Sequence, residues 1–218
     1  MPLCFKEKLG DDAVWGIWEI KEEEDWFFKQ WQLSPEENQH SNKLNGRKKL
    51  EYLSARHLVH LLTELENRMP MHTSISGKPI FLCHPTLHLS ISHSHGYAAA
   101  IISKACKVGI DIQLIVPQMQ KVATREFSEK ELSFIPVGKE LEMLHIFWGI
   151  KEAVFKAYGI GGIDFKEQIK IQPFEYQDKS GEFKALLLKE KLSIMYIGNY
   201  HILPAGYVSI YLFEEIEV

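Results

Sequence analysis

The sequence predicts an α+β protein organised as two halves. Two long helical patterns, Arg47 to Glu66 and Leu141 to Tyr158, lie one in each half, and runs typical of β-strands flank both of them. A length of 218 residues fits one large domain or two halves of roughly 100 residues each. We place an N-terminal half at residues 1–105 and a C-terminal half at residues 106–218.

In the N-terminal half the sequence indicates where a strand and several helices begin and end. Val14 to Ile20 is rich in β-branched and aromatic residues and predicts a strand, which a short helix follows over Lys21 to Gln32. Ser34-Pro35-Glu36-Glu37 is typical of a helix start, because serine caps, proline fits the first turn and acids complement the helix dipole. Leucines at helical spacing predict the long helix over residues 47–66.

Three strands are predicted around the middle of the chain. Gly77-Lys78-Pro79 indicates a turn, and Leu87 to Ser92 alternates strictly, which predicts a half-buried strand with Leu87, Leu89 and Ile91 inward. Tyr97 to Ile102 and Val108 to Leu114 are further strands, and we expect these two to pair as a hairpin.

The C-terminal half repeats the mixture. Ser128 and Glu131 have the spacing of a capping box, and the long helix over residues 141–158 should end at Gly159. After Asp164 the chain predicts short strands at Gln168–Gln172, Phe183–Leu188, Leu192–Ile197 and Tyr207–Phe213.

Composition and charge exclude several classes of protein. Hydrophobic residues make up 45% and charged residues 25%, which excludes a disordered, collagen-like or fibrous chain. With 25 basic and 29 acidic residues the net charge is 25 − 29 = −4, which argues against a general nucleic-acid-binding protein. No apolar run approaches the ~20 residues that cross a bilayer, and no signal peptide is visible. We expect a cytoplasmic protein that binds neither nucleic acid nor membrane.

Cysteines and histidines cluster once, between Cys83 and His95. This stretch holds Cys83, His84, His88, His93 and His95, but their spacing fits no zinc pattern well. The three cysteines of the chain are far apart, so neither a disulfide framework nor a cysteine-rich zinc site is expected. A structural or exposed role is expected for His84, His88 and His95, and a non-catalytic metal-binding module stays an alternative.

The strand over residues 108–114 carries the first candidate site. Asp111 and Gln113 share one face, about 7 Å apart along the strand, and Gly109 leaves room beside them. Oxygen ligands of this kind suit Mg²⁺, which takes one or two carboxylates together with waters and phosphate oxygens. The alternative is an exposed polar strand face.

The second candidate site lies on the long helix of the C-terminal half. Glu152 and Lys156 are i,i+4 neighbours and Trp148 lies one turn earlier, although such a pair is also common on a solvated helix face. If Asp111 and Glu152 converge, the Mg²⁺ that they hold would neutralise a pyrophosphate. Lys151 and Lys156 would then bind phosphate oxygens or protonate a leaving group.

These segments resemble the 4′-phosphopantetheinyl transferase superfamily. Val108-Gly109-Ile110-Asp111-Ile112 is similar to its G-(I/V)-D strand, and Trp148-Gly149-Ile150-Lys151-Glu152-Ala153-Val154-Phe155-Lys156 to its W-x-x-K-E-(A/S)-x-x-K helix. Supporting matches, in the family's order, are Tyr52 to Arg56, Gly77-Lys78-Pro79, Leu89 to Ser94, and Arg125 to Ser128 with Glu131-Leu132. The matches span about residues 47 to 159, and the length is similar to that of the monomeric surfactin-type branch.

The resemblance implies a fold and a reaction. The fold is a pseudo-dimer of two similar halves, each with a small antiparallel sheet and a long helix, with coenzyme A and Mg²⁺ (or Mn²⁺) bound in the cleft between them. The reaction moves the phosphopantetheine arm of coenzyme A to a serine of an apo acyl or peptidyl carrier protein and releases adenosine 3′,5′-bisphosphate. Such carriers serve fatty-acid, polyketide or nonribosomal peptide synthesis.

Residue roles are carried over from the family by position. Asp111 and Glu152 resemble the metal ligands, and Glu152, directly or through a metal-bound water, resembles the base for the carrier serine. Lys156 resembles the lysine that stabilises the pyrophosphate and protonates the leaving group. The resemblance implies coenzyme A contacts at Arg56, Lys78, Ser92, His93, Lys151, Lys156 and, with a looser alignment, Arg47.

Two positions depart from the family pattern. Gln113 stands where the surfactin-type pattern has Glu, so the third metal ligand is either its amide oxygen or an additional water. Gly149 stands where Ser, Thr or Cys is usual, and we expect no chemistry there. Because Gln113 removes a charge, a relative that binds coenzyme A without turnover stays an alternative.

An acidic carrier protein should dock on a basic surface. Lys121, Arg125 and Lys130, near the helix that Ser128 starts, are the candidate residues, and an ordinary charged helix face is the alternative.

Overall fold

The computed structural model describes residues 2–216 and separates them into two compact units, Met1–Ala105 and Cys106–Val218. Residues 1, 217 and 218, at the outer ends of the two predicted halves, lie outside the described residues. Among the residues described, no helix has the length and apolar character to cross a bilayer.

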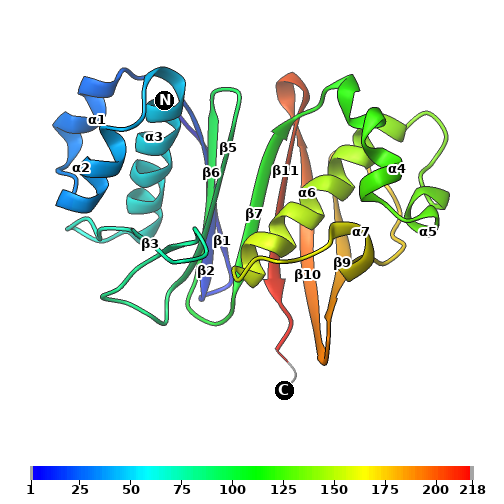
Figure 1. Ribbon diagram of the computed structural model, residues 1–218. Helices are drawn as coiled ribbons and strands as arrows, with labels where there is room; N and C mark the ends of the chain where they lie inside the picture. Colours follow the sequence, from blue (N-terminus) through cyan, green and yellow to red (C-terminus); the bar gives the residue numbers. More distant parts are fainter. Residues whose placement is uncertain (1, 217–218) are drawn as a thin grey trace. The chain divides into compact units, whose positions relative to one another are not determined.

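The first unit is an antiparallel sheet with a long helix on it. The sheet order is β1-β2-β6-β5, from β1 (Leu3–Leu9), β2 (Ala13–Glu19), β5 (His88–Ser94) and β6 (Tyr97–Ser103). The helices are α1 (Glu24–Gln30), α2 (Pro35–Ser41) and α3 (Gly46–Thr63), and α3 packs along β6 and β2 (Figure 1). A short hairpin of β3 (His72–Thr73) and β4 (Pro79–Ile80) holds the predicted Gly77 turn.

The second unit has the same ingredients. Its sheet order is β7-β11-β10-β9-β8, and α6 (Glu140–Tyr158) packs on β7 and β11 (Figure 1). The strands are β7 (Val108–Leu114), β8 (Ile169–Ile171), β9 (Ser180–Lys189), β10 (Leu192–Leu203) and β11 (Tyr207–Glu214). The remaining helices are α4 (Ala123–Glu126), α5 (Glu129–Ser133), α7 (Phe165–Gln168) and two 3₁₀ turns at Pro117–Lys121 and Pro204–Gly206.

The caps confirm the local predictions. Ser34 and Glu37 form a complete capping box at the start of α2, and Ser128 and Glu131 form a second one at α5. Helix α6 ends at Gly159, whose φ of 71° lies in the left-handed region that glycine adopts without strain.

One expectation about the strands is wrong, and one strand was not predicted. β6 and β7 are not a hairpin, because β6 pairs with β2 and β5 whereas β7 pairs with β11. The two runs are consecutive in sequence, yet they belong to different sheets. Strand β1 lies in a charged segment for which no element is predicted, since its side chains are largely exposed at a sheet edge and show no buried face.

Helix α6 crosses β7 at a glycine. A Cβ atom at Gly109 would overlap the backbone carbonyl of Ala153, so the helix and the strand meet backbone to backbone. Gly109 precedes Asp111 by two residues, and Ala153 follows Glu152 directly. This close approach therefore sets how near the side chains of the two motifs lie.

We predict that Gly109→Ala lowers the free energy of unfolding by about 3 kcal/mol or more, because backbone atoms cannot move aside as a flexible side chain does. Chemical denaturation measures the change. Gly138→Asn is the matched control: a Cβ there meets open space, and the positive φ costs an Asn about 1 to 2 kcal/mol. Equal losses in the two variants would contradict the prediction.

Candidate active site

Asp111 and Lys156 form the centre of a polar cluster in the second unit. The Lys156 ammonium donates to Asp111 Oδ1 at 2.7 Å and to the backbone carbonyl of Ile110 at 3.1 Å. Asp111 is only 6% exposed. The strand therefore does not present an exposed polar face at Asp111. The candidate site on the strand over residues 108–114 meets the candidate site on the long helix through Lys156.

Glu152 lies one helical turn before Lys156 and is half-buried. Burial raises the pKa of the Glu152 carboxyl above its ordinary value; the charge of Lys156 opposes this rise, and the charges of Asp111 and Glu126 add to it. The two predicted acidic ligands are thus close enough to repel one another.

This pair of carboxylates fits a divalent cation. Mg²⁺ is commonly held by one or two carboxylates together with waters and substrate phosphates, and a cation between Asp111 and Glu152 would relieve the repulsion between them. Within residues 2–216 no group of three or more His, Cys, Asp or Glu side chains is arranged to hold a metal.

Gln113 lies beside Asp111 but presents its amide nitrogen to it. Gln113 Nε2 is 3.0 Å from Asp111 Oδ2, whereas Gln113 Oε1 is 2.6 Å from His145 Nδ1. Gln113 thus turns its nitrogen toward Asp111, and its oxygen, one of the two expected choices of third metal ligand, lies against His145.

Lys151 faces the interior and not a ligand. Its side chain is 0% exposed, and its ammonium donates to Glu131 Oε2 at 3.0 Å and to the carbonyls of Glu126 and Phe165 at 3.0 and 2.8 Å. Burial lowers the pKa of Lys151 although the carboxylate of Glu131 opposes the shift. Contrary to the sequence expectation, this ammonium is fully engaged inside the unit and is out of reach of a phosphate.

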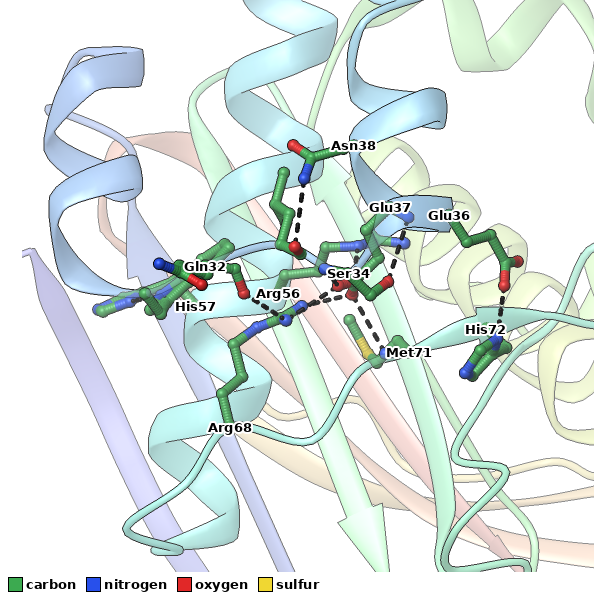
Figure 2. A network of polar contacts seen from close by, with 12 residues as sticks. Gln32, Ser34, Glu36, Glu37, Asn38, Arg56, His57, Arg68, Met71 and His72 are labelled. Atoms are coloured by element: carbon green, nitrogen blue, oxygen red, sulfur yellow. Dashed lines mark hydrogen bonds and ion pairs between the residues drawn. The ribbon is translucent and has the colours of Figure 1, made fainter.

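In the first unit, Arg56 belongs to a buried ion-pair network around Glu37 (Figure 2). Arg56 Nε is 3.3 Å from Glu37 Oε1, and Arg68 Nη1 donates to Glu37 Oε2 at 2.9 Å. Burial alone would raise the pKa of Glu37, but hydrogen bonds from Arg68, Ser34 and Met71 outweigh burial and lower it. Glu37, predicted only as a helix-start residue, is therefore the anchor of Arg56.

Arg56 also lines a cavity. The guanidinium carbon lies 3.3 Å from the centre of the Tyr52 ring, and burial lowers the pKa of Arg56 to about 10. A cavity of about 160 Å³ opens beside it, lined also by His40, Lys43 and Thr73.

Glu51 joins two of the other predicted coenzyme A residues. Arg47 Nε lies 3.2 Å from Glu51 Oε1, and His93 Nδ1 lies 3.2 Å from Glu51 Oε2. Ser92, the neighbour of His93 on β5, is buried, and Lys78 is half-buried in the turn before β4, where its backbone N–H donates to Ser74 Oγ.

Sequence reasoning missed four of these partners, namely Glu37, Glu51, Glu131 and His145. Helical spacing holds a signal for two of them: Glu51 follows Arg47 by four residues, and His145 interrupts the apolar run of α6 four residues before Gly149. Glu131 and Glu37 were visible as capping residues, but a capping box does not reveal that its carboxylate also binds a buried cation.

A family comparison matches this same region. The family model of the 4′-phosphopantetheinyl transferase superfamily matches residues 107–205, which include Asp111, Glu152 and Lys156. Residues 107–205 of this chain are therefore similar to the 4′-phosphopantetheinyl transferase superfamily.

Named relatives agree with this similarity. The chain is 31% identical over 110 residues to 4′-phosphopantetheinyl transferase psf-1 of Bacillus pumilus, covering 49% of this chain and 47% of that protein. It is 25% identical over 168 residues to the L-aminoadipate-semialdehyde dehydrogenase-phosphopantetheinyl transferase of Mus musculus, covering 67% of this chain and 54% of the relative. The human protein of that name is 28% identical over 111 residues, 44% of this chain and 36% of its own length. The chain thus spans about half or less of the length of these relatives.

We predict that Lys151→Met lowers the free energy of unfolding by about 3 to 5 kcal/mol, because it leaves the buried Glu131 carboxylate without its cation. Adding Glu131→Gln should recover part of the loss, since no buried charge then remains. Denaturation curves and calorimetric titration with coenzyme A measure the two effects. A Lys151→Met protein of unchanged stability but weakened coenzyme A binding would restore the phosphate-contact role.

A second prediction concerns the stability of Glu152→Gln without a divalent cation. The pKa of Glu152 is higher in the folded state than the unfolded value of 4.5. Above the folded-state pKa, wild type therefore loses folding stability, because it buries a charged carboxylate. Below pH 4.5 the carboxyl is protonated in both states, and this loss disappears. The variant should be more stable than wild type at pH 8, with the difference vanishing toward pH 4. Melting temperatures across this range test the sign, and the exposed Glu182→Gln is the control. A variant less stable than wild type at pH 8 would refute it.

Proposed function

We propose that this protein transfers the 4′-phosphopantetheine arm of coenzyme A to a serine of an apo carrier protein, with adenosine 3′,5′-bisphosphate as the other product. The observation that carries the proposal is the meeting of Asp111, Glu152 and Lys156 where α6 crosses β7. The match of residues 107–205 to the superfamily model supports the reaction class, and the relatives named above carry this transferase activity in their names.

Each side chain has a distinct task in the transfer. The carrier serine attacks the β-phosphate, and Glu152 accepts the hydroxyl proton. Lys156 places a positive charge beside the pyrophosphate and donates a proton to the departing phosphate. A Mg²⁺ or Mn²⁺ held by Asp111 and Glu152 would supply neutralisation of phosphate charge.

We assign the coenzyme A phosphate contacts to the N-terminal half. Arg56, Lys78, Ser92 and His93 are the proposed contacts, with Arg47 joined to His93 through Glu51. Arg56 is held rigidly by Glu37 and Tyr52, which favours its use as a fixed cation beside the cavity that it lines. Lys151 is left out of this set because its ammonium is buried.

The pseudo-dimer is supported by the topology of each unit taken separately. In the first unit β2 precedes α3, and a later hairpin, β5 and β6, returns so that β6 pairs with β2. In the second unit β7 precedes α6, and the hairpin β10 and β11 returns so that β11 pairs with β7. The same strand, helix and hairpin order occurs twice, as expected of two similar halves.

For the carrier partner we propose the surface of Lys121, Arg125 and Lys130. All three side chains are exposed, and Arg125 borders an open cavity that Asp164 and Lys166 also line. The charges of Lys121 and Lys130, together with Arg125, which pairs with Glu126, would attract the acidic neighbourhood of a carrier serine. A cytoplasmic location, where coenzyme A and carriers are both present, belongs to the same proposal.

Mass spectrometry of a panel of apo-carrier proteins, each incubated with this protein, Mg²⁺ and coenzyme A, tests the function. At least one carrier should gain the mass of the phosphopantetheine arm. Glu152→Gln and Lys156→Ala should each lower kcat by about 10²- to 10⁴-fold, whereas the exposed Glu182→Gln should retain wild-type rates. No mass gain on any carrier, with wild-type protein folded, would overturn the proposal.

One observation favours a second candidate, a relative that binds coenzyme A without turnover. Gln113 brings an amide where the family pattern has a carboxylate, so the site has one negative charge fewer. Calorimetric binding of coenzyme A together with no transfer, even at high Mg²⁺ or Mn²⁺, would select this candidate.

A further inference from the structure

The orientation of the Gln113 amide is decided by two oxygen atoms. Gln113 Nε2 lies 3.0 Å from Asp111 Oδ2 and 3.1 Å from the backbone carbonyl of His145. A carbonyl oxygen and an ionised carboxylate only accept hydrogen bonds, so the NH₂ group must face them. Rotating the amide by half a turn would set its oxygen against the His145 carbonyl, which is part of the α6 backbone and cannot turn away.

His145 holds the other side of the amide. Its Nδ1 lies 2.6 Å from Gln113 Oε1, an acceptor, and therefore carries the ring proton and donates. Its Nε2 lies 2.9 Å from the Val116 N–H and 3.1 Å from the Val116 carbonyl, and with the proton on Nδ1 it accepts from the N–H. His145 is buried, with 2% of its surface exposed, so the hydrogen-bond partners of its two ring nitrogens are fixed by the residues packed around it.

Gly149 makes room for this arrangement. A Cβ at Gly149 would lie 2.9 Å from Gln113 Nε2 and would overlap the Ile210 side chain. The two departures from the family pattern, Gln113 and Gly149, are therefore in contact with each other. A side chain at position 149 would push the amide away from Asp111.

We propose that Gln113 is a positioning residue for Asp111 and not a ligand of the divalent cation. His145 fixes the amide so that its NH₂ group holds Asp111 Oδ2, while Lys156 holds Oδ1. This inference rests on the proposed function for its purpose, and it leaves Asp111 and Glu152 as the protein's cation ligands.

The tautomer of His145 reports the orientation of Gln113. Long-range ¹H–¹⁵N NMR on the full chain should show the proton on Nδ1, both in the free protein and with Mg²⁺ and coenzyme A added. If Gln113 turned its oxygen to the cation, its NH₂ group would face Nδ1, and the ring proton would move to Nε2. An Nε2–H tautomer in the Mg²⁺ and coenzyme A sample would overturn the proposal.

Two amide variants of His145 separate its two hydrogen bonds. Asn places its NH₂ near the position of Nδ1, so His145→Asn keeps a donor for Gln113. Gln reaches the position of Nε2, so His145→Gln keeps the partner of Val116 and loses that donor. We expect Mn²⁺ affinity, measured by electron paramagnetic resonance with coenzyme A present, to stay within about threefold for His145→Asn and to fall at least about tenfold for His145→Gln.

If His145 served only to stabilise the fold, the two variants should have the same Mn²⁺ affinity, because each loses one buried hydrogen bond. Equal Mn²⁺ affinities in the two folded variants would therefore refute the positioning role. Neither measurement uses a carrier protein. Failure of transfer to every carrier, alongside the expected tautomer and affinities, would sink the proposed function and leave the positioning role standing.

Discussion

The backbone contact between Gly109 and Ala153 is the constraint on which the candidate site depends. Any side chain at position 109 would overlap the Ala153 carbonyl, so the strand and the helix approach as closely as main chains can. That approach brings the Lys156 ammonium within 2.7 Å of Asp111. It also brings Glu152 near enough for the charge of Asp111 to raise the pKa of Glu152. A larger separation would leave two unrelated polar patches, one on β7 and one on α6.

Helix α6 divides its polar residues between two surroundings. Lys151 and Lys156 are five residues apart, which is about 140° around a helix, so they point in different directions. Lys156 faces β7 and Asp111, whereas Lys151 enters the interior and binds Glu131. One lysine acts at the candidate site, and the other ties α6 to the start of α5 and, through the Glu131 hydrogen bond to Ile171, to β8.

A comparable division of labour occurs in the first unit. Glu37 caps α2 and at the same time binds Arg56 and Arg68, so one buried carboxylate holds both the helix start and a proposed coenzyme A contact (Figure 2). Buried carboxylates of this kind persist only with several donors around them, since an unpaired charge in the interior is costly. The same contacts hold the Arg56 guanidinium in one position, as its proposed role in binding a phosphate requires.

Local patterns in the sequence determined the two long helices, both capping boxes, the Gly159 stop and most of the strands, because periodicity and capping depend on neighbours in the chain. The spacing of Asp111, Glu152 and Lys156 made them candidates, and the resemblance to a known family singled them out. Only the tertiary structure decided that β6 and β7 belong to different sheets, that Lys151 is buried, and that Gln113 turns its nitrogen to Asp111. Each of these depends on a partner distant in sequence, and no local pattern specifies which distant oxygen a lysine or an amide will meet.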